Sequence, residues 1–168
     1  MNEKVFITGA SSGIGAALAI EYAKRGATLG ISARRSEKLK GIAQQCKESG
    51  AANVFSYTLD VTNQDNSADT AKEFINNANG IDIVIANAGV AHSDKISSGE
   101  ATQINQVFST NVLGVTNSII PFVPTMKENS SGKIVIISSI ASFRPIAFHG
   151  GYSASKSAVR MLADSWRM

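Results

Sequence analysis

Short apolar runs alternate with longer amphipathic stretches along nearly the whole chain. The apolar runs are rich in Val and Ile, which is typical of strands buried on both faces of a parallel sheet. Strands are expected at residues 5–8, 28–32, 54–59, 81–86 and 133–138, and helices at residues 15–24, 37–49, 65–77, 102–127 and from 151 onward. Because right-handed crossovers join parallel strands, the alternation predicts one doubly wound, three-layer αβα domain with strand order 3-2-1-4-5.

Composition limits the function classes. Of the 168 residues, 43% are hydrophobic and 17% are charged, as in ordinary soluble domains. The net charge of +3 comes from scattered lysines and arginines, so no nucleic-acid partner is expected. Aliphatic runs reach only about four residues, so no membrane span is expected. A strand so close to the N-terminus predicts no signal or transit peptide. The single cysteine, Cys46, allows no internal disulfide, and we expect a cytoplasmic protein.

A glycine-rich loop follows the first predicted strand directly and opens a helix. Its glycines would allow a tight turn, a close approach of the backbone to a pyrophosphate and close helix packing. The free N–H groups of the helix N-terminus would bind that anion. No Gly-Lys-Ser/Thr follows, which disfavours a P-loop. The loop therefore predicts a dinucleotide site in a Rossmann-like fold, with contacts from Gly9, Ser11, Ser12, Gly13, Ile14 and Gly15.

Two arginines follow the second predicted strand, where dinucleotide folds select between cofactors. Arg34 lies nineteen residues after Gly15, and Arg35 follows it. An acidic residue at this place binds the ribose 2′-OH of NAD, whereas an arginine accommodates the 2′-phosphate of NADP. Ala33 offers no carboxylate, so NADP(H) is preferred, with NAD(H) as the alternative. Asp60 and Val61, after the third strand, are candidates for the adenine edge, although Asp60 also suits a helix cap.

Tyr152 and Lys156 are four residues apart in the last predicted helix, so both side chains lie on one helix face. A nearby ammonium favours the phenolate form of a tyrosine over the phenol. The pair could therefore act as an acid or base near neutral pH. Ser139 lies thirteen positions before Tyr152, at the end of the fifth predicted strand, and Ser138 beside it competes for the same role.

With these residues in view, the chain resembles the short-chain dehydrogenase/reductase family. The resemblance runs over essentially the whole chain, because the matching motifs occur in the family's order. They are Thr8-Gly-x-x-x-Gly-Ile-Gly15, Asp60-Val61, Asn87-Ala88-Gly89, Asn111, Ser139 and Tyr152-x-x-x-Lys156.

The resemblance implies a hydride transfer between NADP(H) and a small carbonyl or alcohol substrate. Tyr152 would be the general acid/base, Ser139 would polarise the substrate oxygen, and Lys156 would bind the nicotinamide ribose. Asn111 would anchor a water that relays protons to Lys156. Asn87, Ala88 and Gly89 would border the cofactor. The family spacing selects Ser139 over Ser138, and no metal is implied. The family also implies a homodimer or homotetramer formed through the helices of Asn111 and Tyr152.

Other polar residues match no family position. Asn105 and Asn117 are expected on the surface, and His92 and His149 are expected to flank the cleft.

Two features depart from the family pattern. Ser12 stands where many NADP-preferring members have a basic residue, so cofactor preference depends on Arg34 and Arg35. The chain also ends within the helix of Tyr152, whereas members usually add two strands, a Pro-Gly segment and a substrate lid. The domain is therefore expected to be incomplete at its C-terminus. Two alternatives stay open: a nucleotide-binding fragment without turnover, and a non-enzymatic fragment that binds partners through its exposed sheet edge.

Overall fold

A five-stranded parallel sheet forms the centre of the computed structural model, which describes residues 2–94 and 96–167. The predicted order is confirmed: β3-β2-β1-β4-β5. The strands are β1 (Lys4–Thr8), β2 (Thr28–Ala33), β3 (Asn53–Thr58), β4 (Ile83–Ala86) and β5 (Lys133–Ile136). Their bounds differ from the predicted ones by one or two residues. Met1, Lys95 and Met168, which belong to the predicted domain, lie outside the described residues.

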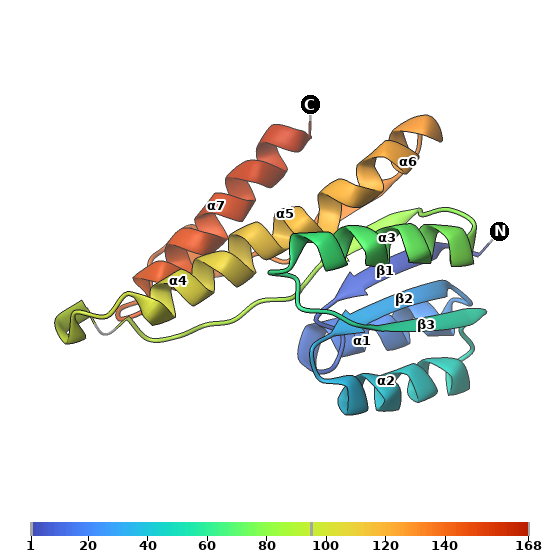
Figure 1. The fold of residues 1–168 in the computed structure, drawn as a ribbon, viewed down its shortest axis with the longest axis horizontal. Helices are drawn as coiled ribbons and strands as arrows, with labels where there is room; N and C mark the ends of the chain where they lie inside the picture. The colour runs from blue at the N-terminus through green and yellow to red at the C-terminus, as the bar shows by residue number, and fades with distance from the viewer. Residues whose placement is uncertain (1, 95, 168) are drawn as a thin grey trace.

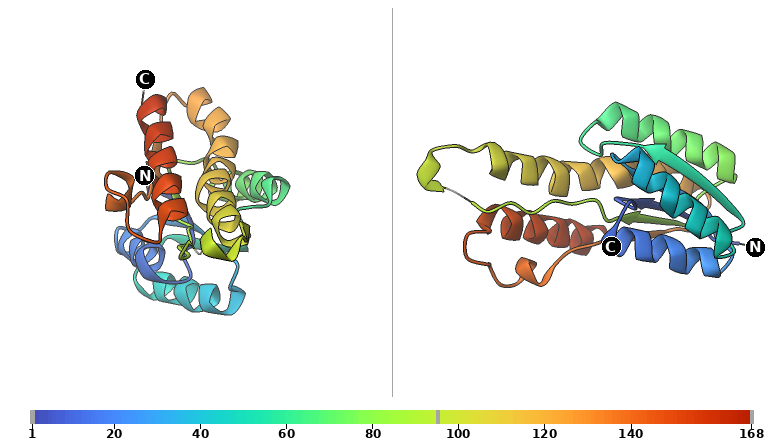
Figure 2. Two further views of the ribbon diagram at one scale, coloured as in Figure 1. Left: turned by 90° about the vertical axis from the view of Figure 1, so that its left-hand side faces the viewer. Right: turned by 90° about the horizontal axis from the view of Figure 1, so that it is seen from below.

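Helices cover both faces of the sheet (Figures 1 and 2). On one face lie α1 (Gly13–Lys24) and α2 (Ser36–Glu48). The other face is covered by α3 (Gln64–Ala78), by a continuous helical stretch and by α7 (Gly150–Trp166). That stretch comprises α4 (Thr102–Phe108), the π-helical segment η2 (Ser109–Leu113), α5 (Gly114–Ile119), the 3₁₀ turn η3 (Ile120–Phe122) and α6 (Val123–Glu128). Two further 3₁₀ turns are η1 (Ile96–Ser98) and η4 (Ile140–Ser142).

Each face of the sheet has its own apolar core. Beneath α1 and α2, aliphatic strand residues such as Ile7 and Leu29 pack against small residues such as Ala19. The opposite face holds an aromatic cluster in which the Phe6 ring centroid lies 5.3 Å from that of Phe74 and 5.0 Å from that of Phe122. Burying such rings supplies much of the driving force for folding. Both cores hold the strands in one register, so their carboxyl ends line up.

The helical stretch from Thr102 to Glu128 is 27 residues long and, by length and composition alone, apolar enough to cross a membrane. The search of the sequence for uninterrupted aliphatic residues did not identify this stretch, because polar residues such as Asn111 interrupt it. In the structure one side of it packs on the sheet through Val115, Ile119 and Phe122, which are fully buried. We therefore interpret it as a core helix. Pro121 does not end the stretch, because the chain passes it in the 3₁₀ turn η3.

All five strands run in the same direction, so their carboxyl ends meet at one edge of the sheet. Ligand sites of doubly wound folds lie at this edge. The loops that leave β1, β2, β3, β4 and β5 there contain most of the residues predicted to bind a cofactor. Among the described residues no strand pairs with the outer side of β5, as the sequence predicts.

Candidate active site

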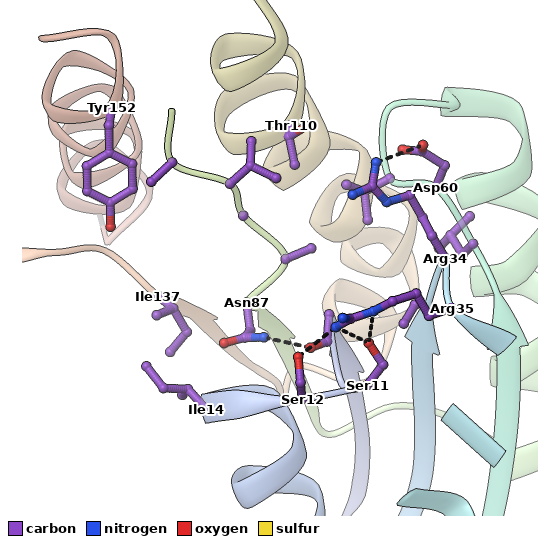
Figure 3. A pocket seen from close by; sticks show the side chains of 18 of the residues that line it. Ser11, Ser12, Ile14, Arg34, Arg35, Asp60, Asn87, Thr110, Ile137 and Tyr152 are labelled. Carbon is purple, nitrogen blue, oxygen red and sulfur yellow. Dashed lines mark hydrogen bonds and ion pairs between the residues drawn. The ribbon is translucent and has the colours of Figure 1, made fainter. Parts of the chain in front are cut away.

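A cavity of about 500 Å³ lies at the carboxyl edge of the sheet (Figure 3). Thirteen of its lining residues are among those predicted from the sequence: Gly9, Ser11, Ser12, Ile14, Arg34, Arg35, Asp60, Val61, Asn87, Ala88, Gly89, Tyr152 and Lys156. Seven more come from the same loops and helices: Ala33, Leu59, Val90, Ala91, Thr110, Ile137 and Ser138. Residues from both ends of the chain therefore share one cavity.

The glycine loop is held tightly against the loop that follows β4. Asn87 donates from its side-chain amide to the carbonyl oxygens of Thr8, at 2.9 Å, and Gly9, at 3.3 Å. Gly9 has a φ of +70°, and a Cβ there would lie 2.8 Å from the Cα of Ala88. A Cβ on Gly15 would press against the Asn87 amide. Only residues without a side chain allow this approach, so both glycines fix the loop that leads into α1.

The N-terminus of α1 faces the cavity with its backbone exposed. Gly13 and Gly15 do not line the cavity, but Gly13 has a φ of +59° and no atom within 4 Å of where its Cβ would stand. The Ser12 side chain makes no capping hydrogen bond to the helix. The first turn thus retains N–H donors for an anionic ligand. These features fit the pyrophosphate of a dinucleotide.

Arg35 crosses from the end of β2 to the glycine loop (Figure 3). Its guanidinium donates to the Ser11 hydroxyl at 3.0 Å and to the Ser12 hydroxyl at 2.7 Å. Arg34 instead lies 3.8 Å from the Asp60 carboxylate, and both of these side chains are exposed. The two adjacent arginines therefore have different partners, and Arg35 with its two serines forms the more cationic corner of the cavity.

Val61 and Asp60 leave β3 beside the helical stretch. Asn117, on α5, donates to the carbonyl oxygen of Val61 at 2.9 Å. A Cβ on Gly114 would lie 2.6 Å from Val61, so the helix approaches this loop closely. The expectation that Asn117 is a surface residue is wrong: it is half-buried and holds one wall of the cavity. In the sequence, Asn117 is marked only by its place one helical turn after Gly114. This spacing indicates a shared contact with Val61 only once the fold is known.

Asn111 lies in the π-helical segment, fully buried, and its side chain is fully engaged. Its Oδ1 accepts from the Val90 backbone N–H at 2.8 Å, and its Nδ2 donates to the Val90 carbonyl and to the Ser155 hydroxyl. Asn111 thus joins the loop after β4 to α7. It does not line the cavity, and the water relay inferred from the resemblance stays a prediction.

Tyr152 and Lys156 project from α7 toward the same end of the cavity. Figure 3 shows the Tyr152 hydroxyl pointing into the space beside Ile137. The Lys156 ammonium lies 5.9 Å from the centroid of the Tyr152 ring. It also donates to the Ile137 carbonyl oxygen at 2.7 Å. Lys156 is 5% exposed, and this burial lowers the pKa of its ammonium below the ordinary value. The predicted pair therefore shares one site.

Ser138 and Ser139 differ in their surroundings. Ser138 lines the cavity, and its hydroxyl donates to the Lys156 carbonyl oxygen at 3.1 Å. Ser139 does not line the cavity; its hydroxyl accepts from the Ala141 N–H at 3.2 Å and begins the turn η4. The two histidines also lie outside the lining. Among the described residues, no three His, Cys, Asp or Glu side chains are grouped to hold a metal ion.

Comparison with known proteins identifies the family. The model of the short chain dehydrogenase family matches residues 3–168. The chain belongs to this family. By that membership it is an oxidoreductase of the NAD(P)-dependent class that acts on CH–OH groups.

Curated relatives of this short-chain dehydrogenase extend beyond the matched region. An uncharacterized oxidoreductase of Listeria innocua is 37% identical over 169 residues, which is 99% of this chain and 67% of the relative. The 11-beta-hydroxysteroid dehydrogenase-like 2 of Arabidopsis thaliana is 36% identical over 98% of this chain and 53% of its own length. The chain thus spans between about half and two thirds of these relatives.

Solved structures of the family superimpose closely. An alcohol dehydrogenase from Thermococcus sibiricus, complexed with 5-hydroxy-NADP, has a TM-score of 0.92 and 30% identity over 99% of this chain and 71% of that chain. A short chain dehydrogenase/reductase from Burkholderia phymatum, in complex with NAD, has a TM-score of 0.92 and 28% identity over 98% of this chain and 59% of that chain. Neighbours with either nicotinamide cofactor therefore share the fold.

Proposed function

We propose that the chain binds NADP(H) and interconverts a ketone or aldehyde with the corresponding alcohol. One observation carries this proposal: a single cavity joins a phosphate-binding corner at Ser11, Ser12 and Arg35 to an acid/base pair at Tyr152 and Lys156. NADP has two matching ends, since its 2′-phosphate lies on the adenosine ribose and its reactive nicotinamide ring lies at the opposite end of the molecule.

The cofactor end supports NADP(H) over NAD(H). A 2′-phosphate would replace the serine hydroxyls as the partner of Arg35, and its charge of about −2 suits a guanidinium. Arg34 would contribute less, because Asp60 already partly neutralises it. The pyrophosphate would lie against the first turn of α1, where the glycine loop leaves the backbone accessible.

The reactive end supports proton transfer by Tyr152. A bound nicotinamide supplies or accepts the hydride at the carbon that bears the substrate oxygen. In the reducing direction, the Tyr152 hydroxyl donates its proton to that oxygen as the C–H bond forms and the C=O π bond breaks. Lys156 favours the resulting phenolate by its charge. Ser139, or Ser138 in its place, would donate a hydrogen bond to the substrate oxygen.

The acid/base role is tested by Tyr152→Phe, with Tyr22→Phe on α1 as the matched control. A carbonyl panel with NADPH is assayed for cofactor oxidation, and binding is followed by thermal shift. Ligand at 100 times its dissociation constant stabilises by about 2.7 kcal/mol. We expect Tyr152→Phe to abolish turnover and to keep the shift. Turnover retained by Tyr152→Phe would refute the role, and no shift with either cofactor would refute the dinucleotide site.

Cofactor preference is tested by Arg35→Ala, with exposed Arg25→Ala at the C-cap of α1 as the control. Two unit charges about 4 Å apart in water interact by about 1 kcal/mol, so a phosphate of charge about −2 gains about 2 kcal/mol from Arg35. We expect the dissociation constant for NADPH to rise about 30-fold and that for NADH to change less than about twofold. Equal losses for both cofactors would contradict a 2′-phosphate site.

We also propose that residues 1–168 act as one dinucleotide-binding and catalytic domain, and that this domain assembles into a homodimer or homotetramer. Large apolar side chains are exposed on the helices that carry Asn111 and Tyr152, namely Phe108, Leu113, Ile120 and Met161. Such side chains favour association. Light scattering after size-exclusion chromatography tests this: Leu113→Glu should shift the mass toward the monomer, whereas Ile96→Glu on η1 should not.

A further inference from the structure

We propose that Asp94 is a positioning residue for Tyr152: its carboxylate caps the first turn of α7 from a distant loop and so sets where the tyrosine hydroxyl lies. The catalytic part of this inference rests on the proposed function. The structural part stands on the hydrogen bond that the Asp94 carboxylate accepts from the Gly151 N–H in the first turn of α7.

The start of α7 lacks a cap of its own. His149 occupies the N-cap position, and its side chain makes no capping hydrogen bond. Its carbonyl oxygen accepts from Ser153 N–H at 2.9 Å, which leaves the preceding N–H groups of the first turn without intrahelical partners. Asp94 Oδ2 accepts from the Gly151 N–H at 2.8 Å. A carboxylate at this place also interacts favourably with the positive end of the helix dipole.

Two glycines make room for this carboxylate. A Cβ on Gly150 would lie 2.9 Å from Asp94 Oδ2. A Cβ on Gly151 would lie 3.2 Å from Asp94 Oδ1 and 3.2 Å from Ile104. Glycine weakens a helix start, so a pair of glycines here needs a reason. The close approach of Asp94 supplies it.

The backbone of Asp94 fixes the other side of the same junction. Its N–H donates to the Phe148 carbonyl oxygen at 2.6 Å. Phe148 has a φ of +61°, a conformation that a non-glycine residue holds only when its surroundings enforce it. Asp94 therefore forms hydrogen bonds on both sides of His149: its backbone N–H binds Phe148, and its side chain binds Gly151.

These two hydrogen bonds connect the loop that borders the cofactor cavity to the start of α7. Asp94 lies five residues after Gly89, on the segment whose earlier part lines the cofactor cavity. Tyr152 follows Gly151 directly, so the carboxylate holds the Gly150–Gly151 peptide, one peptide before the tyrosine. Reacting groups must be held to within a fraction of an ångström, and a misplacement of about 1 Å can lower the rate about a hundredfold. Asp94 thus ties the position of the acid/base group to the wall that holds the cofactor.

The test compares Asp94→Ala, Asp94→Asn and the control Asp65→Ala, an exposed aspartate in the first turn of α3. We expect Asp94→Ala to lower kcat by about ten- to a hundredfold, with the dissociation constant for NADPH changed less than about twofold. Asp94→Asn keeps an acceptor oxygen and should recover most of kcat. An unchanged kcat in Asp94→Ala, or a loss confined to cofactor binding, would overturn the proposal.

Two further measurements do not rely on wild-type turnover alone. Amide hydrogen exchange of Gly151 should accelerate at least about tenfold in Asp94→Ala, while exchange in α3 stays unchanged. Unchanged Gly151 exchange would overturn the cap even if the wild-type protein proves inactive. Gly150→Ala should accelerate the same exchange in the wild-type background and add little to Asp94→Ala, because its Cβ then meets no carboxylate. Full additivity of the two changes would contradict the assigned contact.

Discussion

Replacing Gly15 by alanine should weaken the fold at the site where the dinucleotide loop meets the sheet. The added Cβ would lie 2.6 Å from the Gly9 carbonyl oxygen and would press on the Asn87 amide. Neither neighbour can yield freely, since one is backbone and the other is hydrogen-bonded to Thr8 at 2.9 Å. Overpacking of this kind destabilises by about 1–3 kcal/mol, and a lost hydrogen bond adds about 1 kcal/mol.

The matched control is Gly41→Ala, because Gly41 lies inside α2 and its Cβ would meet nothing within 4 Å. Alanine is favoured over glycine in a helix interior by about 1 kcal/mol, and this gain applies in full at Gly41 but at most in full at Gly15, the third residue of α1. We therefore expect Gly15→Ala to lower the free energy of unfolding by about 2 kcal/mol and Gly41→Ala to raise it by up to about 1 kcal/mol.

Urea denaturation followed by circular dichroism measures both free energies, and the shift of the midpoint at an unchanged slope gives the difference. A Gly15→Ala protein as stable as the wild type, beside a stabilised Gly41→Ala, would refute the steric reasoning. The same variant should also bind the cofactor more weakly, because Asn87 and Gly9 both line the cavity.

Two further substitutions test other parts of the site. Asn117→Ala leaves the buried Val61 carbonyl without its donor, so unfolding should become easier by about 1–3 kcal/mol and cofactor affinity should fall, whereas exposed Asn105→Ala should change neither. Burial lowers the pKa of Lys156 in the folded state, so the unfolded state binds more protons and the stability contributed at this position rises with pH. The free energy of unfolding of the wild type relative to Lys156→Met, from urea melts at several pH values, should increase as pH rises toward the ordinary lysine value of about 10.5. A difference that stays constant, or falls, would show that the ammonium is not held in a desolvated site.

Much of the fold was predictable because its signals are local. Continuous Val- and Ile-rich runs separated by amphipathic stretches indicate strands buried on both faces, which predicted a parallel sheet. The strand order was predicted from the right-handed crossovers of the doubly wound fold. Strand bounds were less certain by a residue or two, since hydrogen bonding to neighbouring strands decides where a strand ends. The Thr102–Glu128 helix shows another limit: its composition suits a membrane as well as a core, and only its packing on the sheet distinguishes them.

The site was predictable where residue types at short spacing indicate a particular chemistry. Glycines after a strand, arginines after the next one, and a tyrosine four residues before a lysine each suggest a function without the fold. Asn117 and Asp94 suggest no function from the sequence, because their hydrogen-bond partners lie 56 and 57 residues away in the chain. Ser138 and Ser139 are also alike in sequence, and only the direction of the chain after β5 gives them different neighbours.

The sequence by itself determined the class of fold, the glycine loop and the Tyr152–Lys156 pair, because each depends on residue types at short spacing. Tertiary structure alone decided which arginine meets Ser11 and Ser12, and which carboxylate caps α7. Such contacts depend on where the carboxyl ends of separate strands come together. That position follows from the packing of two cores against one sheet, so no short segment of the chain encodes it.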